Sequence, residues 1–244
     1  MARKNKSIKK TGGGLKFWGR HAVEAALDNP NRVIKKISIT REALATLEIP
    51  DDIAVVICDV ADLGRVIPRD APHQGLVLDC APLEDVFLDD VLDGDAARPI
   101  VLLDQVTDPH NVGAIMRSAA AFGAAAIVTQ DRHAPPEGGV IAKSASGALE
   151  VLPWVRVVNL ARALDDIAEA GYWRLGLAGE AETTLADALP AGPVALVLGA
   201  EGPGMRHNIG QHCDALARLP IGEQIESLNV SNAAAIALYA IAAR

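Results

Sequence analysis

Three short blocks of the sequence combine polar side chains with glycine in patterns that could bind a ligand and act on it. The first block covers residues 104–113 and opens a helix that carries Arg117. The second is the loop 199–204, and the third covers residues 219–233. Guanidinium, amide and hydroxyl groups can orient a hydroxyl or a phosphate, while glycines let backbone N–H groups approach a ligand closely. The blocks therefore indicate a binding site with a chemical task.

Arg117 stands on a helix whose other features indicate close packing. We expect Asn111 to cap this helix at its start and Gly123 to end it. The neighbours of Arg117 at helical spacing are small, namely Gly113, Ala114, Ala120 and Ala121. Two interpretations remain open. The guanidinium has a close partner, such as a phosphate, a ribose or another subunit, or it lies at the surface with its stem over the alanines.

The second and third blocks supply further polar groups. The spacing Gly-x-x-Gly-x-Gly in residues 199–204 differs from a dinucleotide-binding fingerprint, and no Lys-Ser/Thr pair follows it as in a P-loop. Glu201 within this loop would repel a phosphate, which favours a ligand with a positive charge or hydroxyl donors. In the third block either Asn229 or Ser231 caps the last helix, so at least one polar side chain besides Ser227 is left for another task.

All three blocks follow apolar strands in a region where strands and helices alternate. From residue 100 onward the pattern predicts strands at 100–103, 125–129, 152–157, 173–177, 194–198 and 215–219. Helical patterns lie between most of them, at 111–122, 139–148 and 160–169. Such alternation predicts an α/β fold with a mainly parallel sheet and helices on both faces. Ligands bind at the carboxyl ends of such strands, so the blocks should meet there.

The N-terminal part predicts a smaller α/β unit with a basic extension. Residues 1–20 hold seven basic side chains and no acidic one, whereas the other 224 residues carry 16 basic and 31 acidic groups. We expect residues 1–16 to form a basic flexible arm, which either contacts phosphates or serves only solubility. The pattern predicts a small domain over 17–81, with a helix at 19–27 and strands at 33–39, 53–58 and 75–80. It also predicts a linker at 82–99.

Composition disfavours several classes of protein. No apolar run approaches the roughly 18 residues that span a membrane, so we expect no membrane association. The three cysteines lie far apart and lack the spacing of metal ligands, which predicts reduced thiols in the cytoplasm and no metal site. The last helix, 230–243, is apolar on almost every side, so we expect a subunit interface to cover it.

Together, the three blocks resemble the motifs of the SpoU (TrmH) family of RNA 2′-O-ribose methyltransferases, in the SPOUT superfamily. The resemblance rests on Asn111, Arg117 and Gly123, on LVLGAEGPGM at 196–205 and on LPIGEQIESLNVSNA at 219–233. It covers residues 100–244. Residues 17–27 and 73–75 also resemble the family's L30e-like substrate-binding domain, in an arrangement similar to that of the group that methylates a guanosine of 23S ribosomal RNA.

The resemblance implies that residues 100–244 form a SPOUT domain whose deep C-terminal trefoil knot binds S-adenosylmethionine. Knots are nearly absent from other proteins, so periodicity alone predicts none. The family pattern assigns the cofactor mainly to backbone groups of Leu177, Ala178, Gly179, Gly199, Ala200, Glu201, Gly202, Leu219, Ile221, Leu228 and Asn229. It also implies a homodimer that pairs through the knot and the C-terminal helix, and ribosomal RNA bound by the N-terminal domain and the arm.

The resemblance also assigns catalytic roles to Arg117, Asn111, Glu201, Ser227 and Asn229. The residue at the position of Arg117 is the family's proposed base or hydroxyl-activating group. Since a guanidinium holds its proton too tightly for ordinary base work, we expect Arg117 to orient the ribose hydroxyl and stabilise the developing alkoxide. An adjacent RNA phosphate could aid the loss of the proton. Asn111 and Glu201 would fix Arg117 and the loop, and Ser227 with Asn229 would shape the floor of the pocket.

Three alternatives to this interpretation differ in what they require. A tRNA 2′-O-methyltransferase would carry the same motifs on another substrate. A non-catalytic RNA-binding or ribosome-assembly protein could keep the fold, but it would not need the polar side chains of all three blocks. A nucleotide-dependent oxidoreductase would need a Gly-x-Gly-x-x-Gly turn after its first strand, and here the strand at 100–103 leads into Asp-Gln-Val.

Overall fold

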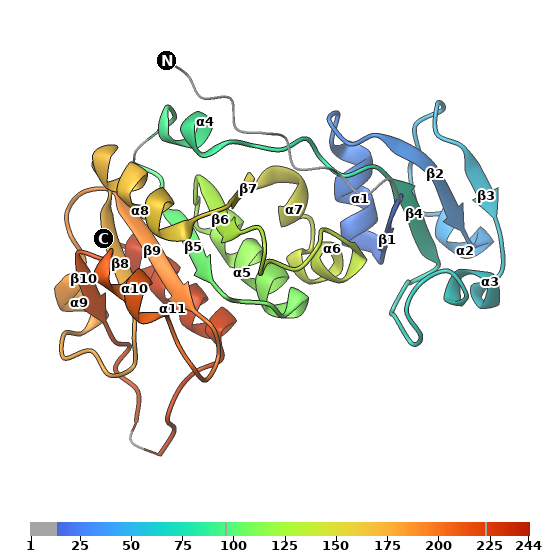
Figure 1. The fold of residues 1–244 in the computed structure, drawn as a ribbon. Coiled ribbons are helices and arrows are strands. Elements are labelled where there is room, and N and C mark those ends of the chain that lie inside the picture. The colour runs from blue at the N-terminus through green and yellow to red at the C-terminus, as the bar shows by residue number, and fades with distance from the viewer. Residues whose placement is uncertain (1–13, 96, 223) are drawn as a thin grey trace.

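The computed structural model describes residues 14–95, 97–222 and 224–244. Most of the arm predicted at 1–16 therefore lies outside the described residues. Within them the strands form two sheets, a smaller N-terminal one and a larger C-terminal one (Figure 1). The two sheets lie at opposite ends of an elongated molecule, with helices between them.

The smaller sheet has the strand order β1-β4-β2-β3, in which only β2 and β3 run parallel. Its strands are β1 (Leu15–Trp18), β2 (Ile34–Ile39), β3 (Val55–Ile57) and β4 (Leu76–Cys80). Its helices are α1 (Arg20–Asp28), α2 (Arg41–Leu44) and α3 (Val60–Gly64). Strand β1 corrects the predicted end of the arm, because Leu15 and Lys16 pair with Cys80 and Asp79. This partner is more than 60 residues away in sequence, so the local pattern around β1 gives no sign of it.

The larger sheet confirms the predicted α/β fold, since every pair of neighbouring strands in it is parallel. Its order is β10-β8-β9-β5-β6-β7. The strands are β5 (Ile100–Asp104), β6 (Ala126–Gln130), β7 (Trp154–Val157), β8 (Trp173–Leu177), β9 (Val194–Gly199) and β10 (Ala215–Ala217). Side chains of β5 alternate between two apolar clusters, which places a core on each face of the sheet.

Helices cover both faces of this sheet, as the alternation predicts. One face packs against α5 (Pro109–Ala121), α6 (Gly139–Ala145), α7 (Ala148–Val151) and α11 (Val230–Ala242). The other packs against α4 (Leu88–Leu92), α8 (Leu160–Glu169) and α10 (His207–Gln211). The short helix α9 (Leu185–Ala188) lies near β10. The segment predicted as a linker, 82–99, thus contains α4, whose Leu88 and Val91 are buried.

Helix α5 begins earlier than predicted. Its N-cap is Asp108, whose carboxylate accepts a hydrogen bond from the backbone N–H of His110, and Pro109 occupies the first helical turn. Proline suits that position because its missing N–H would have no partner there. The prediction that Asn111 caps the helix is therefore wrong, and its side chain is free for other contacts. Gly123 has a φ of +72° just after the helix, as expected of a residue that ends it.

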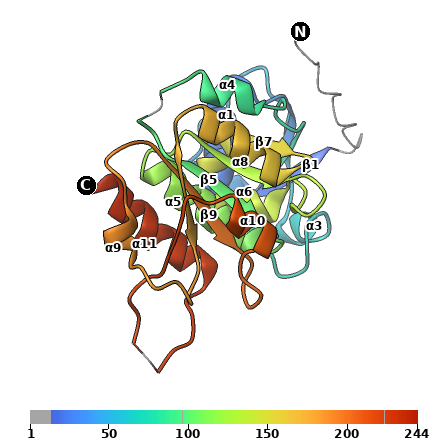
Figure 2. The same ribbon diagram turned by 60° about the vertical axis from the view of Figure 1, so that its left-hand side comes forward.

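Among the described residues, helix α11 has one covered side and one exposed side. It packs on α5 and β9, where Ala234, Ala237 and Leu238 are fully buried. On another side, Ile236 is 46% and Tyr239 is 63% exposed. The chain reaches α11 from β10 through a long loop that projects at the bottom of Figures 1 and 2. No helix in the described part of the chain is long and apolar enough to cross a membrane.

Candidate active site

The loop after β9 folds back on itself more tightly than a side chain would allow. The backbones of Ala200 and Gly204 exchange two hydrogen bonds, of 3.1 and 3.0 Å. A Cβ on Gly199 would lie 2.1 Å from the backbone nitrogen of Met205, so only glycine fits. Gly202 has a φ of +80°, a conformation that glycine adopts without strain. The loop therefore presents bare backbone at the carboxyl end of a central strand.

A cavity of about 790 Å³ opens beside this loop, at the carboxyl ends of β8, β9 and β10. Most of its lining comes from three separate stretches, at 177–180, at 198–207, and at 216–219 with 221 and 226–228. The predicted cofactor residues that line it are Leu177, Ala178, Gly179, Gly199, Ala200, Glu201, Gly202, Leu219, Ile221 and Leu228. Asn229 is not among the lining residues, but Leu228 and Val230 on either side of it are. The second and third blocks thus meet at one cavity.

Asn229 connects all three blocks. Its side-chain amide donates to the Asn111 Oδ1 at 3.0 Å and to a carboxylate oxygen of Glu201. Its own Oδ1 accepts from the backbone N–H of Ser231, which makes Asn229 the N-cap of α11. Glu201 also accepts from the backbone N–H of Val230 at 3.3 Å, so a negative charge lies at the start of α11. The open question between Asn229 and Ser231 as the cap is settled in favour of Asn229.

Arg117 lies apart from this cluster. It is six residues beyond Asn111 on α5, which is roughly 9 Å along the axis and about 240° around it. Its side chain is exposed, does not line the cavity and forms no hydrogen bond or ion pair with any residue that the structure describes. The arrangement in which Asn111 and Glu201 fix Arg117 is therefore not formed within one chain. Ser227, by contrast, lines the cavity.

Arg206 is a cavity residue that lies outside the three sequence blocks. Its backbone N–H and its guanidinium both bond the carboxylate of Asp104, which is fully buried at the end of β5. The guanidinium also donates to Gln130 at 3.0 Å. The available signal was an aspartate that ends an apolar strand, because a buried carboxylate needs a cationic partner. The first arginine after the glycine loop would have been the candidate.

The cavity wall carries charges of both signs. Carboxylates come from Glu180, Glu201 and Glu226, and guanidinium groups from Arg206 and Arg218. A ligand that bears both a positive charge and a carboxylate can be matched by such a wall. Among the described residues, no group of three or more His, Cys, Asp or Glu side chains could hold a metal ion. What the cavity offers is backbone polar groups and fixed charges.

Comparisons with known proteins agree with this geometry. A model described as the SpoU rRNA Methylase family matches residues 98–239. A second model, described as RNA 2′-O ribose methyltransferase substrate binding, matches residues 17–86. The chain belongs to the SpoU rRNA methylase family. Its two sheets correspond to these two matched regions, so the smaller sheet belongs to the family's substrate-binding part and the larger one to its methylase part.

Relatives within the SpoU family extend over nearly the whole chain. The chain is 38% identical to the 23S rRNA (guanosine-2'-O-)-methyltransferase RlmB of Pseudomonas syringae pv. tomato, in an alignment that covers 92% of this chain and 93% of the relative. It is also 38% identical to RlmB of Pseudomonas aeruginosa, over 93% and 95%. Its fold is similar to that of the SpoU methyltransferase AviRb from Streptomyces viridochromogenes in complex with the cofactor AdoMet, with a TM-score of 0.78, 22% identity and coverage of 95% and 90%.

Proposed function

We propose that this chain transfers a methyl group from S-adenosylmethionine to the ribose 2′-hydroxyl of a guanosine in 23S ribosomal RNA. Membership of the SpoU family and the activity named for both Pseudomonas relatives support the reaction and the substrate. The observation that carries the proposal is the cavity at the ends of β8, β9 and β10, where two of the three sequence blocks meet and Asn229 joins the third.

The residues present fit S-adenosylmethionine. Gly179 and Gly202 line the cavity with open space where a Cβ would stand, and Leu177, Leu219 and Ile221 offer further backbone groups. The carboxylates of Glu180 and Glu226 can balance the sulfonium and ammonium charges, and Arg218 can balance the cofactor's carboxylate. When bound, the cofactor supplies an electrophilic methyl group.

The chain's own residues hold and orient the reacting groups. Asn229 and Glu201 fix the third block against the glycine loop, so the cavity keeps one shape. Arg117 orients the ribose hydroxyl and stabilises the alkoxide that develops as its proton leaves. Ser227, at the cavity wall, shapes the floor on which the ribose lies.

We further propose that the C-terminal segment forms a trefoil knot and that two chains pair through it. In support, the chain crosses from β9 past β8 to the sheet edge at β10, and the helix that follows, α11, packs back against α5. The uncovered side of α11 borders an apolar groove of about 810 Å³, lined by residues that include Leu185, Leu189, Pro190, Leu219, Ile236 and Ala240. A second copy would cover this surface.

Pairing through α11 also gives Arg117 a site of action. Since α5 packs directly against α11, a partner that covers α11 lies close to α5 as well. In this proposal Arg117 serves the cavity of the other protomer, which explains why it forms no hydrogen bond or ion pair with the described residues of its own chain. Mixed dimers test this arrangement. An R117A chain combined with an N229A chain should regain activity in the mixture, because one of the two sites then holds both residues.

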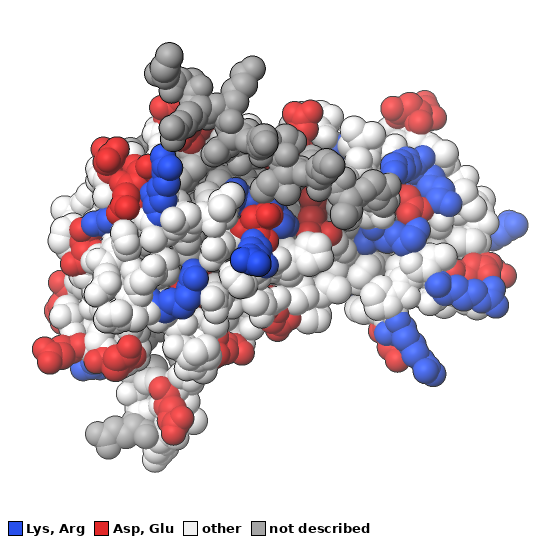
Figure 3. All heavy atoms as spheres, in the orientation of Figure 1, with Lys and Arg blue, Asp and Glu red and all other residues white. Residues whose placement is uncertain are grey.

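The N-terminal part binds the RNA in this proposal. It corresponds to the substrate-binding family model, and several lysine and arginine side chains gather over it at the right of Figure 3. Residues 1–13, with their basic side chains, lie outside the described residues and would add phosphate contacts. Such an enzyme would work in the cytoplasm, on ribosomal RNA or on assembling ribosomes.

The proposed function is tested by R117A together with calorimetry. We expect the wild-type chain to methylate a 23S RNA transcript with tritiated S-adenosylmethionine, and R117A to lose this activity but bind the cofactor as before. Mapping of ribose methylation in a deletion strain would identify the nucleotide. A chain that binds RNA but not the cofactor would be a non-catalytic assembly factor, and a site found in tRNA would identify the other alternative.

A further inference from the structure

Arg32 is an arginine enclosed between the two sheets. It follows α1 in the N-terminal part, and its side chain is 0% exposed. It forms a two-bond pair with Glu150 of α7, at 3.0 and 2.7 Å, and an ion pair with Glu137 at 2.7 Å. It also donates to the carbonyl of Ala81, and its guanidinium lies over the ring of Phe17, 4.9 Å from the centroid. One side chain thus joins β1, the end of β4 and two carboxylates of the methylase part.

The charge of Arg32 is matched where it lies. Burial alone would lower its pKa, but hydrogen bonds and charges from Glu150 and Glu137 raise it. The Glu150 side chain is itself only 3% exposed, and its carboxylate also accepts from Asn29 at 2.8 Å. Moving the two parts of the chain apart would break the two-bond pair and remove the guanidinium from the Phe17 ring, although water would then solvate the separated charges. The pair therefore fixes the orientation of the two parts through its bidentate geometry.

Apolar packing at this interface is equally close. Trp18 of β1 lies on Gly139 at the start of α6, where an added Cβ would lie 1.9 Å from the indole ring. Phe17 and Val23 from the N-terminal part share one apolar cluster with Ile141 and Ala145 of α6. Figure 1 shows β1 and α1 directly against α6 and α7. The two parts therefore share one apolar core.

The segment that connects the two parts, residues 82–99, is also packed against the methylase part. Val86 forms a bridge with Val155 of β7, and Leu88 and Val91 of α4 are buried against the methylase sheet. Lys143 of α6 also donates to the side chain of Gln74, in the loop before β4. Contacts thus lie at both ends of the N-terminal part and along the segment that follows it.

We propose that Arg32 is a positioning residue that holds the substrate-binding part in one fixed orientation, so that the enzyme selects RNA by the set distance between its RNA-binding surface and the methyl-donor cavity. The inference rests on the proposed function, because RNA methylation is what the positioning serves. It requires that the two parts do not swing apart during the catalytic cycle, which a cross-link between them can test.

Ala25 of α1 and Gly147, which precedes α7, are suited to that cross-link. A Cβ on Gly147 would lie 3.1 Å from the Ala25 Cβ, slightly less than the roughly 3.5–4.5 Å of a disulfide. Gly147 has a φ of +96°, so a cysteine there is strained in both redox states, and the comparison of oxidised with reduced protein cancels that strain. Cys58→Ser removes one native thiol. Burial raises the pKa of Cys80 and Cys213 to about 12, which keeps them unreactive.

We expect the A25C/G147C pair to oxidise almost completely under native conditions, a result that needs no RNA and so tests the docking even if methylation is absent. The oxidised form should then methylate the 23S transcript within twofold of the reduced form. A cross-link that forms poorly, or a tenfold loss of turnover on oxidation that reduction reverses, would overturn the proposal. Reduced and wild-type proteins that both fail to methylate would instead count against the proposed function.

A second variant tests Arg32 directly. R32M should lower kcat/KM for the RNA at least tenfold, leave the Kd for S-adenosylmethionine within twofold, and regain most activity when A25C/G147C is oxidised in the same chain. The control is R65M, because Arg65 is exposed and pairs with Asp62 inside the N-terminal part. Wild-type kinetics in a folded R32M, or no rescue by the cross-link, would refute the role of Arg32. If R32M does not fold, the cross-link in the parent chain still decides.

Discussion

The buried carboxylate of Asp104 accepts hydrogen bonds from Arg206 at both the backbone nitrogen and Nε, each at 2.8 Å. Asp104 ends β5 and Arg206 follows the glycine loop, so this pair fixes the loop to the central strand of the sheet. Two backbone hydrogen bonds between Ala200 and Gly204 close the loop itself, and the Asp104–Arg206 pair anchors its end to the sheet. The pair therefore links the stability of the sheet to the shape of the cofactor cavity.

From this pair we expect D104N to weaken both folding and cofactor binding. An amide cannot match the arginine's charge in a fully buried position, so the variant should lose about 2–3 kcal/mol of unfolding free energy. Loosening of the loop should raise the Kd for S-adenosylmethionine about tenfold, which corresponds to roughly 1.4 kcal/mol. Urea titration and calorimetry measure the two effects. The control is D131N, since Asp131 is part-exposed and lies 3.8 Å from Arg156. Equal losses in both variants would contradict the linkage.

Asn229 should matter to activity more than to stability. N229A removes the N-cap of α11, which costs about 1 kcal/mol, and also removes the bonds to Asn111 and Glu201. These bonds hold the three blocks together, so we expect methylation to fall at least a hundredfold while unfolding free energy falls by about 1–2 kcal/mol.

The matched control for N229A is N159A. Asn159 caps α8 in the same manner, on the other face of the sheet and away from the cavity. It should lose a similar amount of stability but keep its turnover. If the two variants lost activity equally, the three-way contact around Asn229 would have no catalytic role.

Local patterns were sufficient for much of this fold. Strand β8 and helix α8 have the predicted bounds, and Gly123 ends α5, because apolar periodicity and backbone conformation are encoded within a few residues. Contacts between distant segments were not encoded in this way. β1 was missed because its partner strand is far away in sequence, and Asn111 was misassigned because the Asp-Pro pair before it makes the better cap.

In the candidate site, too, local patterns could be predicted from the sequence, whereas contacts between distant segments could not. Residues 199–202, 219, 221 and 226–228 line one cavity, and their role in binding the cofactor stays a prediction. Arg206, which follows the loop, was not selected because its role depends on Asp104, about a hundred residues away. The catalytic role of Arg117 remains a prediction, since no described residue forms a hydrogen bond or ion pair with it.

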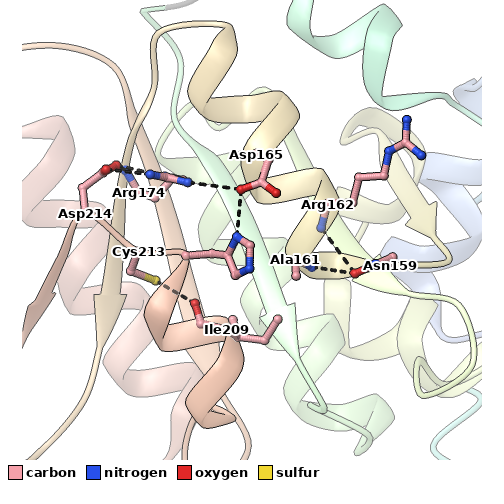
Figure 4. A network of polar contacts seen from close by, with 9 residues as sticks. Asn159, Ala161, Arg162, Asp165, Arg174, Ile209, Cys213 and Asp214 are labelled. Carbon is pink, nitrogen blue, oxygen red and sulfur yellow. Dashed lines mark hydrogen bonds and ion pairs between the residues drawn. The ribbon is translucent and has the colours of Figure 1, made fainter.

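Acid should weaken the contact between β8 and the start of β10. Figure 4 shows Arg174 between Asp214 and Asp165, and its hydrogen bond to Asp214 lowers the pKa of that carboxyl. A lowered pKa means that the pair contributes its full stability above the ordinary value of 3.8 and loses it as the pH falls below that value. We expect D214N to cost about 1–2 kcal/mol at pH 7, and the difference from wild type to shrink steadily as the pH falls below 3.8.

Urea unfolding at a series of pH values measures this difference. D62N is the reference, because the Asp62–Arg65 pair is exposed and such pairs contribute about 0–1 kcal/mol. A D214N deficit that stayed constant down to pH 3 would show that the loss comes from packing and not from the charge.

Gly139 should tolerate no side chain, because Trp18 and the Lys16 carbonyl occupy the space that a Cβ would need, at 1.9 and 2.3 Å. Alanine normally favours a helix over glycine by about 1 kcal/mol, but the carbonyl belongs to β1 and cannot rotate away. We therefore expect G139A to destabilise the chain by about 1–3 kcal/mol.

W18L relieves the clash with the ring but not with the carbonyl, so the double variant should be less destabilised than the sum of the single ones. G64A is the control, since nothing lies within 4 Å of a Cβ at Gly64 in helix α3, and it should be neutral or slightly stabilising. Additive effects of W18L and G139A in urea unfolding would mean that β1 and α6 separate readily, and a shared core between the two sheets would then be excluded.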